Sequence, residues 1–188
     1  MGVETNFWLI RHAPVDGPRG IIHSADAPAD VSDAAAFAAL RARLPKNAFA
    51  VCSPALRTWE TAAALGLDPV KEPAFREQDF GIWTGRRHND LVAELGEAYH
   101  EFWKSPASNR SPGGESFVDQ ISRVHAGLAA LPAGDVVLVV HSGTIRAVLA
   151  IALDLAPDAA LRFVIESLSL TRIDRLENGW HVVAVNQR

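Results

Sequence analysis

The chain has 188 residues, 48% of them hydrophobic and 21% charged, a composition typical of a soluble globular protein. This length predicts a single domain over residues 1–188 with a substantial core. The 18 basic and 22 acidic residues give a formal charge of −4, which argues against an extended nucleic-acid or anionic-membrane surface but leaves room for a local basic pocket.

The sequence also restricts where the protein is expected to act. No apolar run approaches transmembrane length, and the N-terminus lacks a basic segment followed by a signal-type apolar stretch. The single cysteine, Cys52, cannot form an internal disulfide and fits a reducing compartment. We therefore expect a cytoplasmic protein with neither a membrane nor a nucleic-acid partner.

The first predicted element is a strand over the apolar run 7–10, whose composition suits burial on both faces of a parallel sheet. The run ends in Arg11 and His12, and Pro14 then prevents its continuation as a central strand. The next predicted elements are a helix capped by Ser32 or Asp33, a strand over 48–52, a helix from an N-cap at Ser53 to about residue 65, and a short strand over 70–75.

The pattern loosens between about residues 76 and 115, which predicts a short lid-like excursion from the sheet. It contains a turn at 81–85, a helix over about 89–103 and a loop rich in Pro, Gly and Ser over 105–114. Three ring-bearing residues there, Trp83, His100 and Trp103, are expected to be packed in the core or exposed rather than to contact a ligand.

Regular periodicity returns after the excursion. The predicted elements are a helix over 115–131, a strand over 136–140 that ends in His141, a helix over about 145–153, and strands near 163–173 and 180–185 joined by a hairpin turn at Asn178-Gly179. The predicted fold class is α/β: a three-layer sandwich with a mostly parallel sheet and helices on both faces.

Three strand-to-helix junctions carry polar residues at the same topological end: Arg11-His12, the segment from Ser53 to Arg57, and His141. Because the carboxyl ends of parallel strands meet at one edge of a sheet, these residues can share a crevice. Arg57 lies in the first turns of its predicted helix, where the helix dipole disfavours a cation, so a bound anion explains it better than a solvated surface position.

Two histidines and two arginines at one edge suggest phosphoryl transfer through a histidine nucleophile. Arginines can neutralise and orient the phosphate oxygens, and a neutral imidazole can attack phosphorus. The leaving oxygen then needs a proton, which a carboxylic acid can supply. Glu77 and Asp79 are both candidates for that acid, and their spacing does not distinguish them.

Five segments, in order, resemble the histidine phosphatase (phosphoglycerate mutase-like) superfamily. They span nearly the whole chain and are Arg11-His12-Ala13, the Ser-Pro-x-x-Arg-x-x-x-Thr-Ala pattern over 53–62, the stretch 77–85 with its leading glutamate, the Pro-Gly-Gly-Glu-Ser loop over 112–116, and His141 at the end of a Val-rich strand. The ordered set is highly specific, whereas Arg-His alone is common by chance.

The resemblance implies a role for each matched residue. It makes His12 the nucleophile, assigns proton donation to Glu77 rather than Asp79, and implies that Arg11, Arg57 and His141 hold the phosphate. Three positions depart from the family pattern: Ala13 and Ser142 stand where glycine is usual, and Val15 where many members have threonine.

The seven histidines show no ligand-type spacing, so neither a metal nor a cofactor is expected. A serine hydrolase centred on Ser142 is rejected because the nucleophile elbow needs glycine where Val140 and Thr144 stand.

The expected function is hydrolysis of a small-molecule phosphomonoester through a phosphohistidine intermediate. The sequence resembles the α-ribazole phosphatase branch most, which implies α-ribazole phosphate as a candidate substrate. Phosphoglycerate mutase-type phosphoryl transfer and a non-catalytic phosphate-binding module are the alternatives. The presence of His12 and Glu77 favours an enzyme over a binding module, and the compact chain favours a phosphatase over a mutase.

Overall fold

The computed structural model describes residues 4–188 and contains a six-stranded sheet with the order β3-β2-β4-β1-β5-β6. The strands are β1 (Thr5–Arg11), β2 (Phe49–Cys52), β3 (Val70–Lys71), β4 (Gly134–Val140), β5 (Leu170–Leu176) and β6 (Gly179–Gln187). The first four in chain order run parallel to one another, and β5 and β6 add an antiparallel hairpin beside β1. The predicted mostly parallel sheet and the predicted hairpin are both confirmed.

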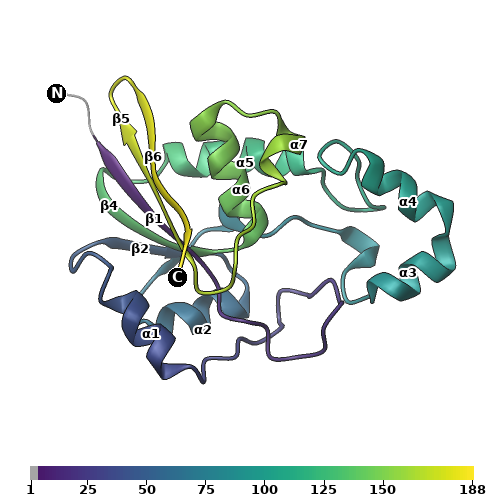
Figure 1. Cartoon of the computed structure of the whole chain (residues 1–188), viewed down its shortest axis with the longest axis horizontal. Coiled ribbons are helices and arrows are strands. Elements are labelled where there is room, and N and C mark those ends of the chain that lie inside the picture. The colour runs from purple at the N-terminus through teal and green to yellow at the C-terminus, as the bar shows by residue number, and fades with distance from the viewer. Residues whose placement is uncertain (1–3) are drawn as a thin grey trace.

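Helices cover both faces of the sheet, as predicted. The helices are α1 (Ala34–Arg41), α2 (Leu56–Ala64), α3 (His88–Leu95), α4 (Glu97–Lys104), α5 (Phe117–Ala129), α6 (Ser142–Leu153) and α7 (Pro157–Ala160), with the short 3₁₀ turns η1 (Pro73–Phe75) and η2 (Gly81–Trp83). Figure 1 shows α1 and α2 on one side of the strands and α5, α6 and α7 on the other.

Strand β4 shows why the sheet needs two helical layers. Its side chains alternate, so that Val136, Leu138 and Val140 pack with α5 and α6 while Val137 and Val139 pack with α1 and α2. All five are fully buried. A strand that is apolar on both faces is stable only between two layers, which places β4 and its neighbour β1 at the centre of the fold.

Three predicted helix boundaries were wrong for local reasons. Helix α2 begins at Leu56 rather than after Ser53, because the Ser53 hydroxyl accepts a hydrogen bond from the Ala55 N–H and forms a turn instead of a cap. The helix predicted over 89–103 is two helices, α3 and α4, separated by Gly96 at φ 52°. Helix α6 begins at Ser142, three residues earlier than predicted.

The strand predicted near 163–173 begins only at Leu170. The residues before it leave the sheet and run past the end of β1, where Leu168 N–H donates to the Arg11 carbonyl and Ile165 accepts a hydrogen bond from the Arg11 side chain. The strand predicted over 70–75 is likewise shorter, because it turns into η1 at Pro73.

The excursion over 76–115 forms a lid of its own beyond one end of the sheet (Figure 1). Trp83, Leu91, Tyr99 and Phe102 make up its apolar core. Backbone hydrogen bonds join the lid to the loop after β1. The Ile22 N–H donates to the Arg86 carbonyl at 3.0 Å, and the Gly85 N–H donates to the Ile22 carbonyl at 2.7 Å. The loop after β1 and the lid therefore enclose the same edge of the sheet.

Within residues 4–188 no helix has the length and apolarity needed to cross a membrane.

Candidate active site

Two buried histidines lie side by side at the carboxyl edge of the sheet. His12 follows β1 and His141 follows β4, its parallel neighbour. The His12 N–H donates to the Val140 carbonyl at 2.9 Å, which extends the sheet pairing by one residue. The two ring centroids are 5.1 Å apart and the planes meet at 65°. Strand adjacency thus brings together two residues that are far apart in the sequence.

The His12 ring has a defined tautomer. Its Nδ1 lies 2.7 Å from the Ala13 carbonyl oxygen, and because a carbonyl can only accept, Nδ1 must carry the proton. Burial lowers the pKa of His12 well below its usual value of 6.5, and nearby His141 and Arg57 lower it further. The ring is therefore neutral near pH 7, and Nε2 presents its lone pair.

His141 is held by one nitrogen only. Its Nε2 lies 2.7 Å from the Ser53 hydroxyl, whereas its buried Nδ1 has no hydrogen-bond partner within residues 4–188. Burial lowers its pKa well below 6.5, and Arg57 and Arg11 act in the same direction. Since buried polar atoms are nearly always paired, the free Nδ1 indicates a place for a ligand atom.

We expect both rings to stay neutral in the free protein at pH values where an ordinary histidine, with a pKa of about 6.5, is half protonated. Long-range ¹⁵N–¹H spectra recorded between about pH 5 and 8 report the state of each ring nitrogen. His12 should show the Nδ1–H tautomer with its transition well below that of a model peptide. A transition of either ring at or above the model value would contradict this assignment.

Two arginines flank the histidines, Arg11 half-buried and Arg57 buried. Arg11 donates from one terminal nitrogen to the Ile165 carbonyl at 2.6 Å, and its buried Nε has no partner within residues 4–188. Arg57 is 5% exposed and donates to the Ser24 carbonyl at 2.8 Å. Burial lowers the pKa of both guanidinium groups from 12.5, while the charge of Glu77 opposes that shift in each. Both side chains are anchored by carbonyls and keep donor groups for an anion.

Glu77 meets this cluster from the start of the lid. One carboxylate oxygen accepts from the Gly143 N–H at 3.2 Å and the Ser142 hydroxyl at 3.4 Å, in the first turn of α6. The other oxygen accepts from Gln78 N–H at 3.0 Å and from Gln120 Nε2 at 3.2 Å. A helix N-terminus provides free N–H groups and a favourable dipole for a carboxylate, so α6 holds Glu77 in place.

Gly143 allows this close approach. A Cβ added at residue 143 would lie 2.1 Å from the Glu77 carboxylate oxygen and 2.9 Å from the Gln120 side-chain oxygen. Any larger residue would therefore displace the carboxylate from the helix N-terminus. The glycine is needed for contact with another side chain and not for its own backbone angle, since it does not adopt a positive φ.

The structure distinguishes Glu77 from Asp79, which spacing alone could not. Both carboxylates line the lobe that contains His141, but only Glu77 also lines the lobe that contains His12. Asp79 is exposed and accepts a hydrogen bond from Gly81 N–H at 2.8 Å, a local turn contact. Glu77 is thus the carboxylate placed to reach a group bound at the histidines.

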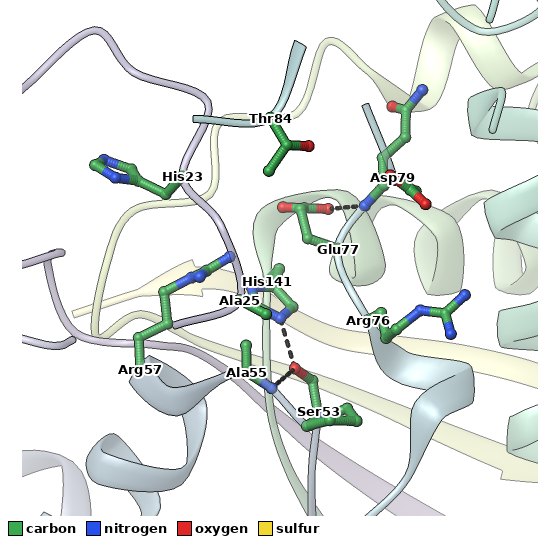
Figure 2. Close-up of a pocket in the computed structure, with 12 residues that line it drawn as sticks. His23, Ala25, Ser53, Ala55, Arg57, Arg76, Glu77, Asp79, Thr84 and His141 are labelled. Carbon is green, nitrogen blue, oxygen red and sulfur yellow. Dashed lines mark hydrogen bonds between the residues drawn. The ribbon is translucent and has the colours of Figure 1, made fainter. Parts of the chain in front are cut away.

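These residues line two adjoining lobes of one cleft. A lobe of about 260 Å³ contains Arg57, Glu77 and His141, and a lobe of about 380 Å³ contains Arg11, His12 and Glu77. Figure 2 shows Arg57, Glu77 and His141 converging on the pocket from different elements. All five residues expected from the sequence are therefore brought together.

The three departures from the family pattern fit without disturbing the cluster. Ala13 is fully buried, adopts no positive φ and bonds through its N–H to the Thr61 hydroxyl at 2.9 Å. Ser142 contacts Glu77, and Val15 lines the lobe beside His12. Of the three ring-bearing lid residues, Trp83 is buried, and His100 and Trp103 are exposed, as expected. Trp103 also lines the lobe that contains His12.

Gln120 is a site residue that was not expected from the sequence. Gln120 is fully buried, and its Nε2 bonds to the Arg76 carbonyl as well as to Glu77, while its Oε1 has no partner within residues 4–188. A polar residue on the apolar face of α5, three residues after Phe117 and four before Val124, was the available signal. Ser53, interpreted as a helix cap, was likewise missed as the partner of His141.

The described residues include no group of three or more His, Cys, Asp or Glu side chains that could hold a metal ion. The cations beside the histidines are arginines, and these are the groups that the structure offers to an anionic ligand.

Comparison with protein families matches residues 7–188 to the histidine phosphatase superfamily, branch 1. The chain therefore belongs to this superfamily. A bifunctional protein of Mycobacterium tuberculosis is 33% identical over 152 residues, 77% of this chain and 42% of its own length. The probable phosphoglycerate mutase GpmB of Yersinia pestis is 32% identical over 132 residues, 66% of this chain and 61% of its own length. The chain thus spans less than two thirds of the length of each of these relatives.

Solved structures share the fold over nearly the whole chain. A mycobacterial glucosyl-3-phosphoglycerate phosphatase has a TM-score of 0.84 at 25% identity, covering 98% of this chain and 100% of its own. A putative α-ribazole-5′-P phosphatase of Escherichia coli has a TM-score of 0.87 at 22% identity, covering 98% and 97%. Both phosphatase and mutase names therefore occur among the proteins similar to this one.

Proposed function

We propose that this protein is a phosphomonoester hydrolase that acts on a small-molecule phosphate through a phosphohistidine at His12. The observation that carries the proposal is the pair of buried, unpartnered nitrogens, Arg11 Nε and His141 Nδ1, beside the free Nε2 of a neutral His12. A phosphate dianion has the oxygens to satisfy these groups, and Arg11 and Arg57 supply the charge that balances it.

In the first step, His12 Nε2 attacks phosphorus and the bond from phosphorus to the leaving oxygen breaks. Protonated Glu77 gives its proton to that oxygen, so the alcohol departs neutral and Glu77 becomes a carboxylate. In the second step, water attacks the phosphohistidine while Glu77 takes up one of its protons. The phosphorus–nitrogen bond breaks, inorganic phosphate forms and Glu77 is again protonated.

The names of the similar proteins supply substrates to test. α-Ribazole phosphate, glucosyl-3-phosphoglycerate and 3-phosphoglycerate are the phosphate esters that those names indicate. A mutase would return the phosphoryl group to glycerate, whereas a hydrolase passes it to water. We favour the hydrolase, because the lid over the site is short, with only α3 and α4, and mutases of this superfamily carry a larger excursion.

We expect the purified protein to release inorganic phosphate from at least one of these esters, to do so after exhaustive chelation, and to be inhibited by vanadate. Chelation should have no effect because arginines, and not a metal ion, neutralise the phosphate in this proposal. Phosphate release and the isomerisation of 3-phosphoglycerate are measured in parallel. Isomerisation without phosphate release would indicate a mutase, and activity that is lost on chelation and restored by a divalent metal would contradict the arginine-based mechanism.

A further inference from the structure

A third lobe of the cleft, of about 190 Å³, lies next to the two lobes that hold the histidines. It shares Glu77 and Gln78 with both of them, but His12, His141, Arg11 and Arg57 do not line it. We call it the aromatic lobe, because most of its wall is apolar and ring-bearing: Phe80, Phe102, Trp103, Pro106, Phe117 and Leu161. Its volume suits a ring-sized group and not a polymer.

One cation, Arg146, lies in the wall of this apolar lobe. It is half-buried on α6, one turn after Ser142, and its Nε donates to the Phe163 carbonyl at 2.9 Å. Within residues 4–188 it forms no ion pair, and its two terminal nitrogens make no hydrogen bond. Burial of this guanidinium costs desolvation free energy, and the charge of Glu77 offsets that cost only in part, so an anionic ligand at the free terminal nitrogens would be favourable.

The fixed Nε determines what Arg146 can bind. Because the carbonyl of Phe163 holds one edge of the planar guanidinium, the two terminal nitrogens form a preorganised fork. A fork of this kind matches the two oxygens of a carboxylate. Burial lowers the pKa of Arg146, while the charge of Glu77 opposes that shift, as it does for Arg11 and Arg57.

The proposed chemistry determines which part of the substrate enters the aromatic lobe, so this step rests on the proposed function. In-line attack by His12 places the leaving oxygen on the far side of phosphorus, next to its proton donor. Glu77 is the proposed donor and lines the aromatic lobe as well as the two catalytic lobes. The body of the leaving group therefore extends past Glu77 into the aromatic lobe.

We propose that the aromatic lobe is the leaving-group subsite, and that it selects phosphomonoesters whose leaving group combines an apolar, ring-sized body with a carboxylate. The rings of Phe80, Phe102 and Trp103 contact the apolar body, and the Arg146 fork binds the carboxylate. Specificity then comes from the charge of Arg146. Because this charge lies outside the phosphate site, it acts on the leaving group alone.

The test uses two substrates of the same shape, 3-carboxyphenyl phosphate and 3-carbamoylphenyl phosphate. They differ in the charge of the group that would contact Arg146. The wild-type protein should favour the carboxylate in kcat/KM. In Arg146→Gln, kcat/KM for the carboxylate substrate should fall by about 10- to 100-fold, which is the effect expected from losing a charge-assisted pair. For the amide substrate, kcat/KM should fall much less. Arg162→Gln removes the same charge from an exposed residue close to the lobe and should preserve the preference.

Equal losses of kcat/KM on the two substrates in Arg146→Gln would overturn the proposal. It would also be overturned if Arg162→Gln lost the preference for the carboxylate as strongly as Arg146→Gln does. Binding of the matched non-hydrolysable benzylphosphonates, measured by calorimetry, tests the subsite without turnover. If no phosphomonoester is hydrolysed, the proposed function fails, but the ratio of the two dissociation constants in wild type and Arg146→Gln still decides the role of the lobe. Thermal melting confirms that each variant is folded.

Discussion

Replacing His12 by asparagine should reduce kcat by about 10⁴–10⁶-fold and abolish the phosphoenzyme, because this change removes the attacking nitrogen. Asparagine keeps an N–H that can donate to the Ala13 carbonyl, the bond that His12 Nδ1 makes at 2.7 Å, so the loss is chemical and not structural. Rapid mixing with a ³²P-labelled phosphomonoester, an alkaline quench and peptide mapping should locate one label on His12 in the wild-type protein.

Two other histidine variants serve as controls. His125→Ala removes an exposed imidazole from α5 and should leave labelling and turnover intact. His141→Ala should weaken phosphate binding and slow turnover, because it removes the ring held by Ser53 beside the phosphate site. Label that persists undiminished in His12→Asn would assign the nucleophile to another residue, and the proposed mechanism would be wrong.

Replacing Glu77 by glutamine should slow phosphoryl transfer from an alkyl phosphate by about 10²–10⁴-fold and from p-nitrophenyl phosphate far less. An alkoxide needs a proton as it leaves, whereas p-nitrophenolate is already a stable anion. Single-turnover rates are the right measurement, because steady-state values can report hydrolysis of the phosphoenzyme instead. The selectivity between the two substrates, and not the absolute loss, identifies Glu77 as the acid.

Two matched variants separate this role from other effects. Arg57→Ala should slow both substrates comparably, since the phosphoryl oxygens that Arg57 would contact are common to them. Asp79→Asn removes the other candidate carboxylate, which is exposed and bonded to Gly81, and should keep the leaving-group dependence of the wild type. Equal losses on both substrates in Glu77→Gln, together with selective losses in Asp79→Asn, would transfer the acid to Asp79.

The contacts around Glu77 link its position to that of His141. Helix α6 begins directly after His141, so the same turn that ends β4 provides the N–H group that holds the Glu77 carboxylate. Gln120 and Arg123 hold the backbone around Glu77 through the carbonyls of Arg76 and Glu77, at 3.2 and 3.0 Å. Glu77, the proposed acid, is therefore positioned by the elements that also position His141, the proposed phosphate ligand.

The central part of this fold follows from the amino-acid pattern alone. Apolar runs over 7–10 and 136–140 can be stable only as strands covered on both faces, and each ends in the residues of the candidate site. Because parallel strands end at one edge, Arg11, His12 and His141 could be expected to meet. The ordered motifs then led to the superfamily, which the family comparison confirms.

The contacts that hold the site residues could not be predicted without the folded structure, because their partners are distant in sequence. The Arg11 anchor is a carbonyl 154 positions away, Glu77 bonds to a backbone N–H 66 positions away, and Ser53 meets His141 across 88 positions. Local patterns record propensity and periodicity, and they contain no information on such contacts. For the same reason, the places of Gln120, Ser53 and Arg146 in the cleft could be recognised only from the packing of β4, α5, α6 and the lid.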